Sequence, residues 1–153
     1  GHVVSDCGAI SDFHLHHKVT KTPEESAALA VNNGCDLNCG RVFESLLAAW
    51  LLGDGWEVLV PVIDHGKKTD LVVADDDNFY RIQVKSIQTK DESIRVENKW
   101  QGAKIDYVVY FSTLGDWGYI TPAFTEANRP LNSQGHIRFC KHPANFLKAF
   151  KRI

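Results

Sequence analysis

The stretch TDLVVADDDNFYRIQVKSI, residues 69–87, holds two apolar runs on either side of an acidic turn. DLVVA (70–74) and FYRIQVKSI (79–87) have the composition of strands, because valine, isoleucine and aromatic residues suit a pleated, half-buried surface. The short DDDN connection favours a tight turn that makes the two strands neighbours. Such a pairing would set Asp70 across from the segment that contains Gln83 and Lys85.

Helices and strands are also predicted on both sides of this pair. WEVLVPV (56–62) has a strand pattern, and the residues before it recur at helical spacing and end at Gly53. IRVEN (94–98) is expected to continue the sheet. Two more strands are predicted at KIDYVVYFST (104–113) and WGYITPAF (117–124), followed by a terminal amphipathic helix with Phe146, Ala149 and Phe150 on one side. The pattern predicts an α/β fold, with a helix, a mixed β-sheet and flanking helices, for a domain spanning residues 41–153.

The first forty residues form a separate, βαβ-like pattern. HVVSD (2–6) and CDLNCG (35–40) are read as short strands, and FHLHHKVTK (13–21) as a histidine-rich loop. Thr22 is suited to cap a helix that starts at Pro23, because proline tolerates the first helical position. One βαβ unit cannot cover both faces of a sheet, so we expect residues 1–40 to be an appendage.

Charge and composition restrict the class of protein. The net charge is −2. It divides into −3 for residues 1–40, which hold two lysines and five acids, and +1 for residues 41–153. A DNA-binding surface would therefore require basic residues gathered on one face. No apolar run approaches the roughly 18–20 residues that span a bilayer, and no signal pattern begins the chain, so we expect a soluble, cytoplasmic protein. The four cysteines do not suggest a disulfide framework. The absence of methionine leads us to expect a fragment of a longer reading frame.

A possible catalytic site follows from the strand pattern. Residues two apart on a strand project from one face, so Gln83 and Lys85 are expected side by side, with Asp70 opposite them. Glu44 on the preceding helix could add a second carboxylate. Oxygen ligands and an ammonium are what metal-assisted phosphodiester hydrolysis requires. The competing interpretation is a solvated sheet face of alternating polar residues.

The order of these elements resembles the PD-(D/E)xK nucleases. The similarity runs from Gly40 to Ile153 and rests on Glu44, GWEVLVPV, a glycine-containing loop, the Thr69-Asp70 strand start and the string RIQVK. It is strongest toward the branch of homing endonucleases and Holliday-junction resolvases. The resemblance implies a restriction-endonuclease-like core, Mg²⁺ or Mn²⁺ as cofactor, double-stranded DNA as partner, and a homo-oligomer.

The resemblance also assigns roles. It implies catalytic residues Glu44, Asp70, Gln83 and Lys85, and metal ligands Asp70, Gln83 and Val84. Gln83 stands where most members have an acid, and because an amide oxygen brings no charge, weaker binding of a single metal ion is expected. Lys67 and Lys68 are candidate DNA contacts, with a charged surface loop as the alternative.

Residues 1–40 resemble a different family, the family 3 glycoside hydrolases of the β-xylosidase and β-glucosidase type. VVSD resembles the strand that carries the glycosyl nucleophile, which falls on Asp6, and CDLNCG resembles the next barrel strand. The segment is only the last part of a (β/α)₈ barrel, and no counterpart of the acid/base carboxylate is present. We expect Asp6 to be idle.

Several alternatives remain open at this point. A zinc site could be formed by cysteines and histidines of the first forty residues: Cys35 and Cys39 with Cys7, His14, His16 or His17. The favoured interpretation is a nuclease of homing or mobile-element type, joined in frame to a glycosidase fragment. A glycosidase carrying this domain as an insertion, and a non-catalytic nucleic-acid-binding remnant, are the other two.

Overall fold

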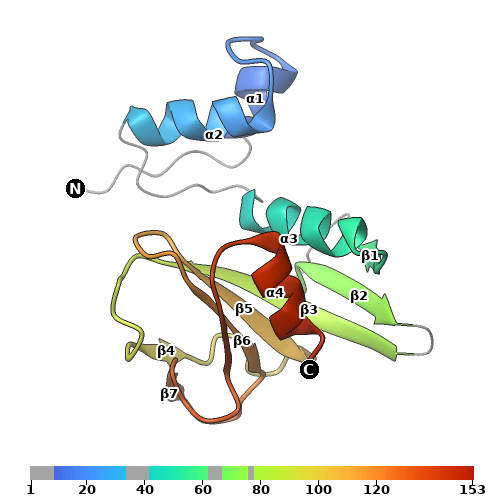
Figure 1. Ribbon diagram of the computed structural model, residues 1–153, viewed down its shortest axis with the longest axis vertical. Coiled ribbons are helices and arrows are strands. Elements are labelled where there is room, and N and C mark those ends of the chain that lie inside the picture. Colours follow the sequence, from blue (N-terminus) through green and yellow to red (C-terminus); the bar gives the residue numbers. More distant parts are fainter. Residues whose placement is uncertain (1–8, 34–41, 62–66, 76–77) are drawn as a thin grey trace. The chain divides into compact units, whose positions relative to one another are not determined.

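The chain packs as two units, residues 1–45 and residues 46–153. The computed structural model describes residues 9–33, 42–61, 67–75 and 78–153, which are coloured in Figure 1. None of the helices in these ranges is long and apolar enough to cross a membrane.

The first unit contains two short helices, α1 (Ala9–Leu15) and α2 (Pro23–Asn32). Thr22 caps α2 as predicted, because its hydroxyl accepts a hydrogen bond from the Glu25 amide at 3.2 Å. The loop predicted at residues 13–21 is wrong at its start, since residues 13–15 complete α1. The strands predicted at residues 2–6 and 35–40 lie outside the described ranges.

The second unit is built on a mixed six-stranded sheet. Its strand order is β1-β2-β3-β5-β6-β8, in which only β3 and β5 run parallel. The bounds are β1 Glu57–Leu59, β2 Leu71–Asp75, β3 Asn78–Ile87, β5 Tyr107–Ser112, β6 Gly118–Pro122 and β8 Ile137–Phe139. The hairpin predicted from residues 69–87 is confirmed, because β2 and β3 pair antiparallel with Leu71 opposite Ile82.

One face of this sheet, which we call the helix face, is covered by α3 (Val42–Gly53) and α4 (Pro143–Phe150) (Figure 1). Trp50 of α3 contacts Phe111 of β5, with ring centroids 6.0 Å apart, and Phe146 of α4 contacts Phe139 of β8 at 5.2 Å. Gly118 permits this packing, because a Cβ atom there would lie 2.2 Å from the Phe139 ring. The helix predicted at Phe146, Ala149 and Phe150 is confirmed, and all three residues are buried.

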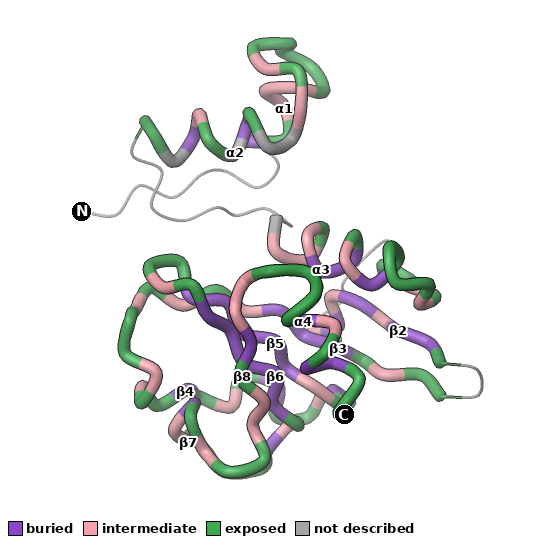
Figure 2. Tube along the Cα trace, viewed as in Figure 1, coloured by how far each residue is buried: buried purple, intermediate pink, exposed green. Residues whose placement is uncertain are grey.

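A small two-stranded sheet stands apart from the main one (Figure 1). It consists of β4 (Arg95–Glu97) and β7 (Asn128–Pro130), paired antiparallel, and we call it the β4–β7 ribbon. The other face of β5 and β6, which we call the ribbon face, is covered by a second core beneath this ribbon. The residues of this core are Val96, Trp100, Ile105, Val108, Tyr110, Trp117, Tyr119, Phe124 and Leu131. Figure 2 shows the buried strands of the sheet between the exposed connections.

Two strand predictions need correction. A strand does form within residues 94–98, but this strand, β4, pairs with β7 and does not continue the main sheet. The strand predicted at residues 56–62 is shorter, since β1 covers only Glu57–Leu59. The short strands β7 and β8 were not predicted.

Candidate active site

The hairpin brings Asp70 and Gln83 together. Asp70 directly precedes β2, and its amide donates a hydrogen bond to the Ile82 carbonyl at 2.9 Å. The carboxylate then turns back to β3, where Oδ2 accepts a hydrogen bond from the Val84 amide at 2.7 Å. Two bonds therefore fix Asp70 on both sides of Gln83, and the second is strengthened by the charge of the carboxylate.

Gln83 occupies an unusual environment for a polar side chain. It lies within β3 with only 4% of its surface exposed, between two apolar neighbours on the strand. Among the described residues, its Oε1 atom has no hydrogen-bond partner. A buried acceptor without a partner costs about 1–3 kcal/mol, so this position favours a ligand that binds oxygen.

Val84 adds a third oxygen beside these two groups. Main-chain groups of one residue point to the same edge of a strand, and the Val84 amide faces Asp70. The Val84 carbonyl therefore points to the edge where β2 has not yet begun. A carboxylate, an amide oxygen and a carbonyl form an oxygen donor set of the kind that Mg²⁺ takes.

The described ranges contain no cluster of three or more His, Cys, Asp or Glu side chains suited to a metal ion. The set at Asp70 differs in kind, because two of its three oxygens come from an amide side chain and a main chain. A buried amide oxygen without a partner among the described residues is chemically suited to an oxygen-seeking cation.

Lys85 lies on the same side of β3 as Gln83. In the parallel pairing with β5, Gln83 is opposite Val108 and Lys85 is opposite Tyr110. Val108 and Tyr110 both belong to the core on the ribbon face. The candidate site thus lies on the ribbon face of the sheet, away from α3 and α4.

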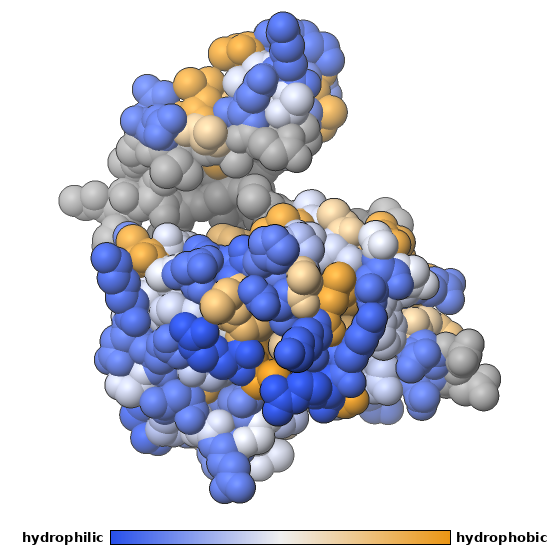
Figure 3. Space-filling view, in the orientation of Figure 1, coloured by the Kyte–Doolittle hydropathy of each residue, from blue (hydrophilic) through white to orange (hydrophobic). Residues whose placement is uncertain are grey.

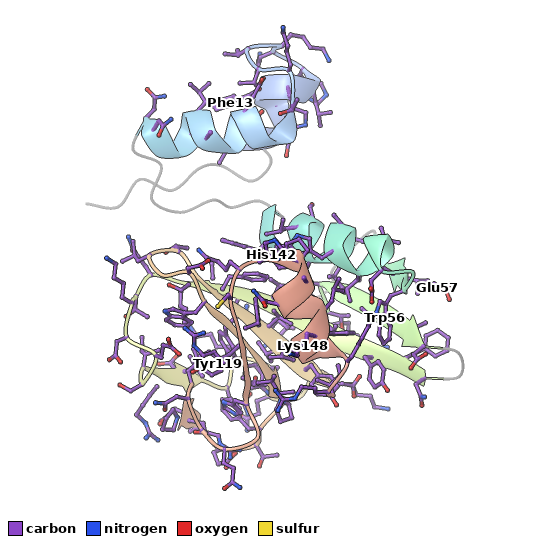
Figure 4. The ribbon with its side chains drawn as sticks, in the orientation of Figure 1. Phe13, Trp56, Glu57, Tyr119, His142 and Lys148 are labelled. Atoms are coloured by element: carbon purple, nitrogen blue, oxygen red, sulfur yellow. The ribbon has the colours of Figure 1, made fainter. Side chains whose placement is uncertain are left out.

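Tyr119, Glu92 and Arg138 form a hydrogen-bonded cluster next to Tyr110, which we call the polar clamp. Tyr110 pairs with Tyr119 on β6, whose hydroxyl donates to Glu92 at 2.7 Å, and Glu92 also accepts two hydrogen bonds from Arg138 at 2.8 and 2.9 Å. The Arg138 bond holds the pKa of Glu92 below its usual value. Burial, with the Glu92 bond, raises the pKa of Tyr119 to about 12. These bonds fix the segment after β3 against the sheet, and Figure 4 labels Tyr119.

The two candidate DNA contacts differ in their surroundings. Lys67 is exposed, whereas Lys68 is half-buried, and its ammonium donates to the Lys99 carbonyl. Lys68 also has a positive φ of 59°, which is uncommon for a residue with a side chain. The sequence offers no signal for this contact, which joins the segment before Asp70 to the segment after β4.

The other predicted site residues are not brought to this place by anything described. Glu44 lies in the first turn of α3, and the boundary between the two units falls after Ser45. Asp6, Cys7, Cys35 and Cys39 lie outside the described residues. His14 and His16 bond instead to Ser26 and Asp12, at 2.9 and 2.7 Å.

A surface hollow near α3 is unrelated to the predicted residues. It is lined by Asp54, Trp56, Glu57, Asp75 and Lys151, among others. Lys151 forms an ion pair with Asp54 at 2.7 Å, which lowers the pKa of that carboxyl, and Trp56 packs on Phe150 (Figure 4). Asp54 and Lys151 of this hollow are thus engaged with each other.

Comparison with known proteins gives two kinds of relative. The chain is 61% identical over 44 residues to a probable exo-1,4-β-xylosidase of Aspergillus clavatus, and 40% identical over 58 residues to a β-xylosidase/α-L-arabinofuranosidase of Medicago sativa. These matches cover 28% and 35% of the chain, and the chain spans only 6% and 8% of the lengths of these relatives. The expected partial similarity to glycoside hydrolases is confirmed over a short segment.

Solved structures give the second kind. The chain is similar to a bacterial homing endonuclease, with 22% identity, a TM-score of 0.43, and coverage of 65% of this chain and 70% of that one. It is also similar to a Holliday junction resolvase of Archaeoglobus fulgidus, with 17% identity, a TM-score of 0.39, and coverage of 56% and 82%. The mixed sheet with flanking helices is the α/β architecture expected from the sequence.

A family model decides the assignment. The model of the PD-(D/E)XK endonucleases matches residues 38–116, more than half of the chain. That range contains α3, the β2–β3 hairpin and the parallel strand β5. The chain belongs to the PD-(D/E)XK endonuclease family.

Proposed function

We propose that this protein is a divalent-metal-dependent DNA endonuclease of homing or mobile-element type, with its active site at Asp70, Gln83 and Lys85. The observation that carries the proposal is the buried Gln83 oxygen without a partner among the described residues, next to the fixed Asp70 carboxylate. A solvated sheet face would not leave a side chain with 4% exposure in this state.

Asp70, Gln83 and the Val84 carbonyl would hold Mg²⁺ or Mn²⁺. When bound, such an ion would supply charge neutralisation at the phosphate and would help to activate a water. Asp70 brings the negative charge of the set, and its bond to Val84 aligns the main-chain carbonyl beside it. Because Gln83 brings none, we propose a single ion held more weakly than by two carboxylates.

Lys85 would orient the attacking water and offset charge on the phosphate. Its position two residues after Gln83 sets its side chain on the same side of β3. In-line attack on phosphorus would break the bond to the leaving oxygen, and the reaction consumes one water per bond.

The proposal is tested with supercoiled plasmid and linear duplex DNA in Mg²⁺, Mn²⁺ or EDTA. We expect nicking or cutting only with metal, loss of cutting in Asp70→Ala, and loss in Lys85→Ala with smaller loss of metal binding. Asp75→Ala is the matched control, because Asp75 is exposed at the other end of β2. Cutting that survives in Asp70→Ala contradicts the site. Because a homing enzyme can require a long target, the substrates include a randomised duplex library.

Gln83 gives a second, independent measurement. Gln83→Glu adds a charge to the donor set and should tighten Mn²⁺ binding, whereas Gln83→Leu should abolish cutting. Calorimetric titration measures Mn²⁺ binding to both variants, and plasmid nicking measures the cutting. Identical titrations for the two variants would mean that Gln83 is not a ligand.

Double-stranded DNA and a homo-oligomer complete the proposal, since two symmetric sites suit the cutting of two strands. Sedimentation velocity measures the assembly.

The segment similar to xylosidases is proposed as a joined fragment without activity. It spans a few per cent of those relatives, too little for a barrel. We expect no hydrolysis of aryl xylosides or glucosides. Turnover that disappears in Asp6→Ala would reverse this ranking.

A further inference from the structure

The β4–β7 ribbon has no part in the chemistry proposed above, yet it borders the candidate site directly. Its supporting core includes Val108 and Tyr110, the β5 residues paired with Gln83 and Lys85. Neighbouring strands lie about 4.8 Å apart, so ribbon core and site share one face of the sheet. A hydrogen bond forms a second link between ribbon and site: the Lys68 ammonium donates to the Lys99 carbonyl. Lys68 lies two residues before Asp70, and Lys99 lies two residues after the end of β4.

The ribbon is rigidly supported from below. Val96 points inward with 6% exposure, and Asn98 and Trp100 both donate hydrogen bonds to the Phe124 carbonyl, at 2.8 and 3.2 Å. The main-chain N–H of Asn98 also donates a hydrogen bond to the Ala127 carbonyl at 2.9 Å. These contacts hold the connection between β4 and β7 in a fixed register.

Its outer face carries polar groups in a defined arrangement. Because Val96 points inward, Arg95 and Glu97 point outward, and the register sets Pro130 and Asn128 on the same outer side. Arg95 Nε donates to Asn128 Oδ1 at 2.6 Å, and this pair is exposed. This hydrogen bond occupies the Oδ1 acceptor of Asn128. The groups of the pair that remain available on the outer face are therefore mainly the N–H donors of the Arg95 guanidinium and the Asn128 amide. Glu97 is engaged by Lys99 at 3.5 Å.

We propose that the β4–β7 ribbon contacts duplex DNA in a groove beside the scissile phosphate, through the Arg95–Asn128 pair. This inference rests on the proposed function. A major groove about 12 Å wide accepts a two-stranded ribbon, and the guanine edge in it presents two acceptors to a guanidinium. Phosphate oxygens can also accept hydrogen bonds from this pair. Each ribbon strand has three residues and is about 10 Å long, which restricts contact to roughly three base pairs.

The test compares two variants with the same change of charge. Arg95→Glu alters the outer face of the ribbon. Lys148→Glu alters an exposed residue of α4 on the opposite, helix-covered side, where hydrophilic residues predominate (Figures 3 and 4). Both are measured by fluorescence anisotropy with a labelled 30-base-pair mixed-sequence duplex in EDTA, so that binding is observed without cutting. Thermal unfolding of both variants checks that they are folded.

We expect Arg95→Glu to weaken binding by about tenfold or more, Asn128→Ala by a few-fold, and Lys148→Glu by less than twofold. Metal-dependent nicking at saturating Arg95→Glu should remain, since Asp70 and its partners are unchanged. Equal losses in Arg95→Glu and Lys148→Glu would overturn the ribbon assignment while leaving the nuclease intact. If the wild-type chain neither binds nor cuts duplex DNA, both the ribbon assignment and the proposed function fail.

Discussion

The two units of this chain are stabilised in different ways. In residues 46–153, aromatic side chains of α3, α4 and the sheet form a continuous packed layer, with ring centroids 5.1–6.0 Å apart among Trp50, Trp56, Phe111, Phe139, Phe146 and Phe150. Among the side chains described in residues 9–33, the buried ones are Ile10, Ala30 and Ser26. The described contacts of the sheet unit are thus mainly apolar packing, whereas those of the helix pair include hydrogen bonds that meet at Ser26.

The largest expected effect is in the aromatic layer. Phe146 is fully buried between Trp50, Phe139 and Phe150, so Phe146→Ala removes contacts with three rings and leaves a cavity. We expect the free energy of unfolding to fall by about 3–5 kcal/mol, measured by urea denaturation. A loss below about 1 kcal/mol would contradict the packed layer, and Leu147→Ala, a half-buried neighbour, is the control.

A smaller effect is expected at Ser26 in the helix pair. Its hydroxyl bonds to His14 Nδ1 at 2.9 Å, to the Thr20 hydroxyl at 2.6 Å and to the Thr22 carbonyl at 3.1 Å. Ser26→Ala leaves these groups without their shared partner, at a cost of about 1–3 kcal/mol.

Hydrogen exchange measures where that cost appears. Amides of α1 and α2 should exchange faster in Ser26→Ala, while amides of β3 and β5 should not change. Equal acceleration in both regions would show that the two units unfold together. Exposed Ser45→Ala is the control.

The next effect is an acid sensitivity confined to the sheet unit. His136 Nδ1 bonds to the Leu131 carbonyl at 2.8 Å, and its Nε2 is buried without a partner among the described residues. Burial lowers the pKa of His136 from its ordinary value of 6.5. A histidine with a lowered folded pKa favours the neutral form, so the unfolded chain binds more protons as the pH falls below about 6.5.

We therefore expect the stability of the sheet unit to decrease from pH 7 toward pH 5. The slope of the unfolding midpoint against pH should be shallower in His136→Gln. Exposed His142→Gln is the control and should keep the wild-type slope. A slope unchanged in His136→Gln would assign the sensitivity to other groups.

The smallest effect is expected from removal of residues 1–39. This deletion retains α3 and every element of the sheet unit. The main unfolding transition and DNA cutting should stay near their full-length values. An insoluble or molten product would show that the two regions share one core. Limited proteolysis of the full chain should cut first within residues 13–21 or 38–41.

The sequence predicts some elements of the fold well because their patterns are local. The strand predicted at residues 79–87 is β3, and the helix predicted to end at Gly53 is α3. The partner of β4 could not be predicted, since β7 lies about thirty residues further on and includes Pro130, which disfavours a strand. Likewise, β1 ends before Pro61 as an edge strand, which the apolar run of residues 56–62 conceals.

In the candidate site, too, local patterns predict some features, whereas contacts between residues distant in the sequence determine the others. The side-by-side position of Gln83 and Lys85 follows from the two-residue period of a strand, and their opposition to Asp70 follows from the short turn. The bond between Asp70 and Val84 and the burial of Gln83 depend on the exact register and on strand β5. The bond from Lys68 to Lys99 joins residues 31 positions apart, and no local pattern reveals it.

The origin of the two ribbon strands has a consequence for the order of folding. Strand β4 belongs to the connection between β3 and β5, and β7 to the connection between β6 and β8. The ribbon can pair only after both connections have been anchored by the six-stranded sheet, because closing a loop of about thirty residues is entropically unfavourable by itself. The ribbon is therefore a late-forming element that can open while the sheet stays folded. Its amides should exchange through local opening, at a lower free energy than those of the parallel pair β3 and β5.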